Sequence, residues 1–184
     1  MPKALVVLAP GFEEIEAISI IDVLRRGEID VTVAGLTDGP ITGSHDITIV
    51  PDTVLEKTDH TVFDVLVLPG GQPGTNNLKA DERLLQWIRD RFKNGQKLAA
   101  ICAAPTVLHK AGITDRLKVT SYPSEKAVFT NSEYSEEPVV KDGHVITSRG
   151  VGTALAFGLA LIEELQGKEK AREVAERILF KAEC

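Results

Sequence analysis

Apolar residues along the chain fall into short continuous runs and into stripes with helical spacing, and the two kinds alternate. Continuous apolar runs are typical of strands that are buried on both faces of a sheet. We predict four such strands, over residues 3–9, 29–35, 62–68 and 98–101. Apolar residues at intervals of three and four predict amphipathic helices over residues 13–26, 81–93, 103–110, 152–166 and 168–180.

The order of these elements predicts the architecture. The first three form a β-α-β unit, which implies a right-handed crossover between two parallel strands. Shorter alternating pieces predict a hairpin or another elaboration of the sheet edge over residues 41–50, and a hairpin over 139–147 with its turn at Asp142-Gly143. A short strand is expected over 117–120, before a polar segment. Alternating strands and helices together predict an α/β sandwich with a mainly parallel sheet.

Length and charge narrow the class of protein. The 184 residues are expected to form a single domain, 1–184, and 43% hydrophobic with 26% charged residues is ordinary for a globular chain. A net charge of −6 argues against a nucleic-acid partner, which requires a concentrated Lys/Arg face. The first apolar run ends at Pro10-Gly11, and no run approaches the roughly 20 residues of a membrane helix. We expect neither nucleic acid nor membrane as a partner.

The two cysteines, Cys102 and Cys184, form no disulfide framework, so a reducing cytoplasm is the expected compartment. Cys102 lies where the run 98–101 passes directly into a helix start marked by Pro105. At such a turn the sulfur faces free backbone N–H groups and the positive end of the helix dipole, which favour the thiolate and lower the pKa. The position predicts a nucleophile. The alternative is a small buried hydrophobe, since free cysteines are often buried.

A glycine pair follows the predicted strand 62–68. In open α/β sheets, ligands bind beyond the carboxyl ends of strands, so this turn is expected beside Cys102. Gly70-Gly71 offers backbone N–H groups for one half of an oxyanion hole, and the N–H of Ala103 offers the other half. The alternative is an ordinary strand-to-loop turn.

Acidic residues crowd the first turn of the first predicted helix. Most such acids, here Glu13 and Glu14, are solvated caps that the helix dipole favours. Glu16 differs because its neighbours Ile15 and Ala17 are apolar. Burial would raise the pKa of its carboxyl group and allow it to donate or accept a proton.

The histidines show no metal-binding pattern in the sequence. His60, His109 and His144 are expected in turns or on exposed faces. No spacing of His, Cys, Asp and Glu resembles that of a metal site, and residues 70–74 lack the order of a dinucleotide-binding motif. The residues therefore give no sign of a metal site or of a bound dinucleotide.

Four stretches of the chain resemble the motifs of one family. They are residues 8–16 (LAPGFEEIE), 67–71 (VLPGG), 99–105 (AAICAAP) and 147–150 (TSRG). In this order and at this spacing they resemble the motifs of the DJ-1 family, which is the Parkinson-disease-associated deglycase branch of the PfpI superfamily. The resemblance extends over nearly the whole chain. The resemblance implies a flavodoxin-like three-layer sandwich, a homodimer and no cofactor.

The resemblance also implies roles for residues of the site. Cys102 would be the nucleophile, hydrogen-bonded to a protonated Glu16 that shuttles protons, with the amides of Gly71 and Ala103 as the oxyanion site. Arg149 would lie near the pocket and bind an anion. The implied activities are glutathione-independent conversion of methylglyoxal-type α-oxoaldehydes to hydroxy acids, repair of early glycation adducts on proteins, and protection against oxidative stress.

Some positions depart from the family pattern. Tyr122 stands where many animal members carry a pocket histidine, and His45 stands where they carry an arginine beside the partner's pocket. Because a phenol is not a base at neutral pH, Glu16 is the expected proton shuttle. Peripheral cysteines of the family are replaced by Gly43 and Val50. The pocket residues expected besides the catalytic ones are Tyr122, Gly70, Arg149 and His45.

Two hypotheses for the function follow. One is a cysteine-dependent glyoxalase and deglycase, and the other is a redox sensor or chaperone that works through oxidation of Cys102 without turnover. Related branches are excluded on single residues. A PfpI-type peptidase would have histidine in place of Ala103, and a glutaminase would have a late His-x-Glu, whereas His144 is followed by Val145 and Ile146.

Overall fold

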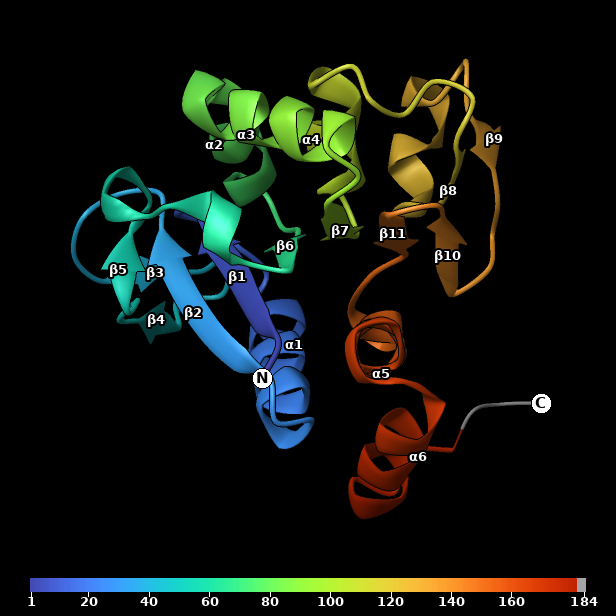
Figure 1. The fold of residues 1–184 in the computed structure, drawn as a ribbon. Coiled ribbons are helices and arrows are strands. Elements are labelled where there is room, and N and C mark those ends of the chain that lie inside the picture. The colour runs from blue at the N-terminus through green and yellow to red at the C-terminus, as the bar shows by residue number, and fades with distance from the viewer. Residues whose placement is uncertain (182–184) are drawn as a thin grey trace.

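A seven-stranded sheet forms the centre of the molecule in the computed structural model, which describes residues 1–181 (Figure 1). The strand order is β10-β11-β7-β6-β1-β2-β5, and every neighbouring pair is parallel except β10 with β11. The strands of this sheet are β1 (Lys3–Leu8), β2 (Asp30–Gly35), β5 (Thr53–Val54), β6 (Val65–Leu68), β7 (Lys97–Ile101), β10 (Val139–Asp142) and β11 (Val145–Ser148). The predicted mainly parallel sheet is confirmed.

Helices cover both faces of the sheet and give three layers (Figure 1). One face carries α1 (Glu14–Arg26), α5 (Ala154–Gln166) and α6 (Lys168–Arg177), and the other carries α2 (Gly74–Ala80), α3 (Glu82–Lys93) and α4 (Pro105–Lys110). Alternate residues of β1 belong to the two cores: Ala4, Val6 and Leu8 to the first, Leu5 and Val7 to the second. The predicted α/β sandwich is therefore confirmed.

The first helix begins and ends where the sequence predicts. Glu13 is its N-cap, and the Glu13 side chain accepts a 2.7 Å hydrogen bond from the backbone N–H of Glu16. Gly27 caps the other end after Arg25 and Arg26, whose charges suit the negative end of the helix dipole. This firm start fixes the direction in which the first-turn side chains point.

Both predicted segments form hairpins. Antiparallel β3 (Ile41–Thr42) and β4 (Thr48–Ile49) form the first, and β10 with β11 forms the second. The register places the second turn at Gly143-His144, one residue later than predicted, because Asp142 still pairs with Val145.

Two features differ from the sequence-based expectation. Helix α2 was not predicted, because its sequence GTNNLKA begins with glycine and contains two asparagines. Glycine and asparagine are both poor helix formers. The predicted strand 117–120 is present as β8 (Lys118–Val119), but it pairs with β9 (Glu133–Tyr134) in a separate small sheet within the polar segment. Short 3-10 turns fill the remaining connections: Leu55–Lys57, His60–Val62, Pro123–Val128 and Val151–Thr153.

His60, His109 and His144 were expected in turns or on exposed faces. His60 and His144 do lie in turns, but all three are half-buried rather than exposed. Each packs against an aromatic ring, with centroid distances of 4.6 Å for His60–Trp87, 4.9 Å for Phe92–His144 and 5.6 Å for His109–Phe129. Such contacts depend on residues distant in sequence. Within residues 1–181, no helix combines the length and apolar character needed to span a bilayer.

Candidate active site

Cys102 lies directly after β7, on the predicted turn into α4. Its backbone has φ +63°, a left-handed conformation that side-chain-bearing residues rarely adopt. Two backbone hydrogen bonds hold it there: its N–H donates to the Ser148 carbonyl at 3.0 Å, and its carbonyl accepts from the Tyr122 N–H at 2.7 Å. Neighbouring segments thus fix the strained backbone, an arrangement that is common at functional sites.

Glu16 points inward from the first turn of α1 and is fully buried. Its Oε2 accepts a 2.9 Å hydrogen bond from the N–H of Gly70, and its carboxyl group lies beside the thiol of Cys102. Its Oε1 is buried and has no hydrogen-bond partner among the described residues. The prediction that Glu16 faces the interior rather than solvent is confirmed.

Burial raises the pKa of the Glu16 carboxyl group to about 7, against the lowering effect of the Gly70 amide and the Cys102 thiol. Burial, followed by the charge of Glu16, raises the pKa of the Cys102 thiol to about 12. The expectation that the helix start lowers the Cys102 pKa is therefore wrong, because burial and a nearby carboxylate outweigh it. The pair resists carrying two negative charges, so a thiolate requires that Glu16 hold the proton.

The backbone amides of Ala103 and Gly71 lie beside the sulfur of Cys102 and lower the pKa of its thiol, which opposes the effect of burial. Gly71 has φ +93°, and a Cβ there would lie 2.4 Å from the backbone N of Glu13. Only glycine permits this conformation and approach. Both predicted oxyanion donors therefore meet at the sulfur.

Gly70 packs against both reactive groups. A Cβ at this position would lie 2.7 Å from Cβ of Cys102 and 2.9 Å from Oε2 of Glu16. Any larger residue would push the thiol and the carboxyl group apart. The prediction that Gly70 lines the pocket is therefore wrong: it packs against the reactive pair, forms the floor of the site and is not among the residues that line the cavity.

A cavity of about 570 Å³ opens above the pair. Its lining residues come from the start of α1, the β3–β4 turn, the turn after β7, the segment after β8 and the segment between β11 and α5: Glu13, Glu16, His45, Cys102, Tyr122, Pro123, Arg149, Gly150, Val151, Gly152 and Thr153. Three of the four predicted pocket residues, Tyr122, Arg149 and His45, are on this wall.

Tyr122 forms one side of the cavity. The side chain is half exposed, and its ring packs over Gly150, where a Cβ would lie 3.4 Å from Tyr122 Cδ2. Among residues 1–181 its hydroxyl group makes no hydrogen bond with another residue. The phenol is therefore free to donate to a ligand.

Arg149 supports the wall opposite the reactive pair. Its guanidinium group donates to the carbonyls of Ser121 at 3.5 Å and Glu136 at 3.3 Å. It forms no ion pair with any carboxylate in the described part of the chain. Its charge remains available to an anionic ligand.

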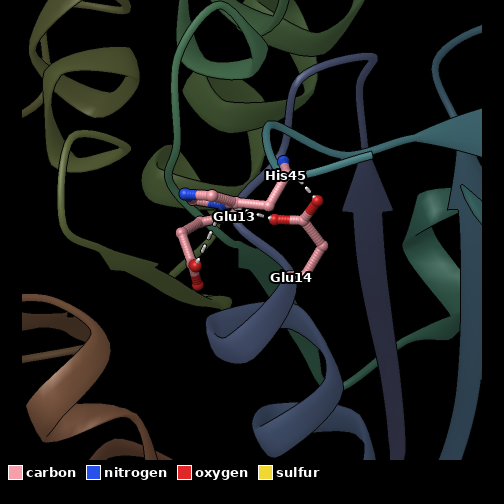
Figure 2. Close-up of side chains that lie close together, drawn as sticks. All are labelled: Glu13, Glu14 and His45. Carbon is pink, nitrogen blue, oxygen red and sulfur yellow. Dashed lines mark hydrogen bonds and ion pairs between the residues drawn. The ribbon is translucent and has the colours of Figure 1, made fainter. Parts of the chain in front are cut away.

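The structure also brings together three ligating side chains that the sequence did not predict as a group (Figure 2). Nδ1 of His45 lies 3.0 Å from Oε2 of Glu14 and 3.9 Å from Oε1 of Glu13. The expectation that Glu13 and Glu14 are solvated is wrong: they are 8% and 2% exposed. The β3–β4 turn folds over them, and Gly43 makes room, since its Cβ would lie 2.4 Å from Cδ of Glu14.

Known proteins are similar to this chain in fold and in sequence. A family model described as DJ-1/PfpI family matches residues 2–164. Protein dj-1beta of Drosophila melanogaster is 50% identical over 180 residues, 96% of this chain and 96% of that protein. Its crystal structure has a TM-score of 0.95 at 48% identity, covering 98% of this chain and 99% of that one. The Caenorhabditis elegans protein named glutathione-independent glyoxalase DJR-1.2 is 37% identical over 175 residues, 94% of this chain and 93% of that protein.

Proposed function

Because this chain belongs to the DJ-1/PfpI family, we propose that it converts methylglyoxal-type α-oxoaldehydes to 2-hydroxy acids without glutathione, using Cys102 as nucleophile. The observation that carries the proposal is the buried Glu16 carboxyl group in contact with the Cys102 thiol, with the amides of Gly71 and Ala103 directed at the same sulfur. The name of the nematode relative supports this reaction class.

The first step is attack on the aldehyde carbon. Glu16, with a pKa of about 7, takes the thiol proton as the C–S bond forms, so no free thiolate accumulates. The carbonyl electron pair moves to oxygen, beside the amides of Gly71 and Ala103. Glu16 then returns the proton to this oxygen and leaves a neutral hemithioacetal on Cys102.

The second step moves hydrogen between the two oxidised carbons. Glu16 takes the proton from the carbon bonded to sulfur and passes it to the neighbouring carbonyl oxygen, which gives an enediol. It then takes the hydroxyl proton from the sulfur-bound carbon, where the carbonyl group forms, and delivers a proton to the neighbouring carbon. The product is a 2-hydroxyacyl thioester of Cys102. Water hydrolyses this thioester to the hydroxy acid and restores the thiol. The net reaction converts one α-oxoaldehyde and one water into one hydroxy acid.

Repair of early glycation adducts uses the same chemistry. A hemithioacetal or hemiaminal on a protein side chain carries the same two-carbon oxo unit as the free aldehyde. The shallow cavity around Tyr122 and Arg149 leaves room for a side chain that bears such an adduct. Attack by Cys102 on the carbon that bears the amine or thiol would form the C–S bond and break the bond to that group, which leaves with the thiol proton. The hemithioacetal on Cys102 would then rearrange as above, and water would release the hydroxy acid.

The decisive experiment measures lactate formed from methylglyoxal in the absence of glutathione. We expect steady-state turnover by the unchanged protein and loss of turnover in Cys102→Ala. Equal, near-zero lactate formation by the two proteins would reject the enzymatic proposal.

A redox-sensing role is the second candidate, and the surroundings of the sulfur favour it. A sulfinate on Cys102 would accept hydrogen bonds from the amides of Gly71 and Ala103 and from protonated Glu16. We expect mild peroxide to stop at the sulfinate, as read by mass spectrometry. Progress to the sulfonate in the unchanged protein would argue against this role.

The assembly proposed is a homodimer in the reducing cytoplasm, where a free thiol persists. Ile15 and Ile18 on α1 are 55% and 44% exposed, which leaves an apolar patch beside the cavity. Light scattering is expected to give twice 19.9 kDa. Ile18→Glu should shift this mass to the monomer, whereas Val62→Glu, at another exposed apolar position, should not.

A further inference from the structure

Glu13, Glu14 and His45 form a second cluster of polar side chains, distinct from the Cys102–Glu16 pair. One ligand atom from each lies within 4.8 Å of the other two. The imidazole ring lies across the start of α1, with the two carboxyl groups beside it (Figure 2). Glu13 and His45 also line the cavity, so the cluster opens to solvent on that side.

Each carboxyl group uses one oxygen to hold the backbone and turns the other toward the ring. Oε2 of Glu13 accepts from the N–H of Glu16, and Oε1 makes no hydrogen bond within residues 1–181. Oε1 of Glu14 accepts from the N–H groups of His45 at 2.6 Å and Ile47 at 3.4 Å. Oε2 of Glu14 faces His45 Nδ1 and the Ser44 hydroxyl group. The oxygens that face the ring, Oε1 of Glu13 and Oε2 of Glu14, are thus oriented before any ligand binds.

The charges of the cluster are not balanced by the protein. Glu13 and Glu14 are 8% and 2% exposed, and His45 is the only residue that pairs with either carboxylate in the described part of the chain. Two nearly buried carboxylates therefore face, at most, one positive charge. Buried carboxylates are costly unless they are paired or coordinate a metal.

We propose that Glu13 Oε1, Glu14 Oε2 and His45 Nδ1 bind a divalent transition-metal ion of the Zn²⁺ type, with a further coordination position open to the cavity. Zn–N and Zn–O bonds of about 2.0–2.2 Å in a tetrahedral site place the ligand atoms roughly 3.3 Å apart. The observed 3.0 and 3.9 Å to Nδ1 lie on either side of that separation. An exposed ring can adjust by these amounts.

The ligand set selects the kind of ion. Imidazole with two carboxylates suits zinc and its neighbours, whereas Mg²⁺ and Ca²⁺ prefer oxygen ligands in larger numbers. The set includes no thiol, so this site is independent of Cys102. It also does not depend on the proposed glyoxalase activity, because binding is measured directly.

The experiment is calorimetric titration of Zn²⁺ into full-length Cys102→Ala/Cys184→Ser, which removes both thiols as competing ligands. One site per chain is expected, with Mg²⁺ and Ca²⁺ giving no binding. His45→Gln and Glu13→Gln should each weaken Zn²⁺ by at least about tenfold. The matched control is His144→Gln, a histidine of the β10–β11 turn at the other end of the sheet, which should leave the affinity unchanged.

Two outcomes would overturn the proposal: no Zn²⁺ binding by the thiol-free chain, or binding that His45→Gln leaves intact. Misfolding does not confuse the second result, since the His45 side chain is 72% exposed and circular dichroism checks the fold. In the chain with both thiols, Co²⁺ gives an independent measurement. We expect visible d–d bands without a sulfur-to-cobalt charge-transfer band, and a strong charge-transfer band would place the ion on a cysteine instead.

Discussion

The carboxyl group of Glu16 is tied to the backbone of Gly70 across 54 residues of sequence, by a 2.9 Å hydrogen bond from the Gly70 N–H to Oε2. This bond joins the start of α1 to the end of β6 and turns the carboxyl group toward Cys102. The proton-carrying group of the proposed reaction is thus held by backbone rather than by a mobile side chain. Such fixed positioning is what general acid–base catalysis requires.

The first prediction concerns the pH dependence of turnover. The active form in the first step has Glu16 as carboxylate, and burial raises its pKa to about 7. kcat/KM should therefore rise as the pH increases through about 7 and then level off. Glu16→Gln should lower kcat/KM by about 10²- to 10⁴-fold and remove this rise. An unchanged pH profile in Glu16→Gln would assign the titration to another group.

The second prediction concerns stability. The folded state raises the pKa of Glu16 above its ordinary value of 4.5, so the folded state holds this proton more tightly than the unfolded state. The stabilisation is complete below the ordinary pKa and is lost as the pH rises through about 7, by about 3 kcal/mol in all. Denaturant unfolding from pH 4 to 8 should show the unchanged protein losing stability relative to Glu16→Gln. If the free energies of unfolding of the two proteins changed in parallel with pH, the prediction would be contradicted.

The third prediction distinguishes the effect of Glu16 on the pKa of the Cys102 thiol from its effect on turnover. The charge of Glu16 helps to raise the pKa of Cys102 to about 12. Glu16→Gln removes that charge, so the thiol should become more acidic and react with iodoacetamide at least about tenfold faster at pH 7, although turnover falls. Labelling of Cys184, which lies outside the described residues, is the internal reference. Slower labelling of Cys102 in this variant would show that Glu16 activates the resting thiol.

The fourth prediction tests the amide of Gly71. Gly71→Ala would place a Cβ 2.4 Å from the Glu13 backbone N at a φ of +93°. We expect a loss of more than about 2 kcal/mol in stability and a displaced amide with strongly reduced turnover. Gly39→Ala is the control, because Gly39 has φ +81° with open space around it. It should cost only about 1–2 kcal/mol and leave turnover unchanged.

The fifth prediction concerns Tyr122, whose hydroxyl group is free of hydrogen bonds to other described residues. If Glu16 is the proton shuttle, Tyr122→Phe should keep kcat/KM within about threefold, a change of under 1 kcal/mol in the barrier. Tyr122→His should change the pH profile without a large gain. A large gain in kcat for Tyr122→His alone would show that the missing imidazole limits the reaction.

The parts of the structure that sequence patterns predicted are those set by local interactions. The helix from Glu13 to Arg26 has its caps within its own sequence, and the turn at Cys102 follows from an apolar run that meets Pro105. The motifs around Glu16 and Gly70-Gly71 were sufficient to predict the floor of the site.

The parts that were missed depend on distant contacts. His45 reaches Glu14 across 31 residues through a short hairpin, so no spacing rule could predict their meeting. The pKa of Cys102 was predicted in the wrong direction because the helix start is visible in the sequence, whereas the depth of burial is not. The same holds for His60, His109 and His144, whose aromatic neighbours come from other elements.

The strand order has a consequence for how the chain reaches its active form. The site needs β1, β6, β7 and β11 side by side, although these strands enter the sheet from positions far apart in the chain. Parallel pairings of this kind close long loops and form late in folding, since the entropy of closure is lost before the contacts are gained. Cys102 then acquires its two backbone bonds, to Ser148 and Tyr122, only when the far edge has docked. Recovery of turnover during refolding would therefore report completion of the whole sheet. In a nascent chain that ends before β11, Cys102 would lack its backbone bond to Ser148, and the site around its thiol would not yet be formed.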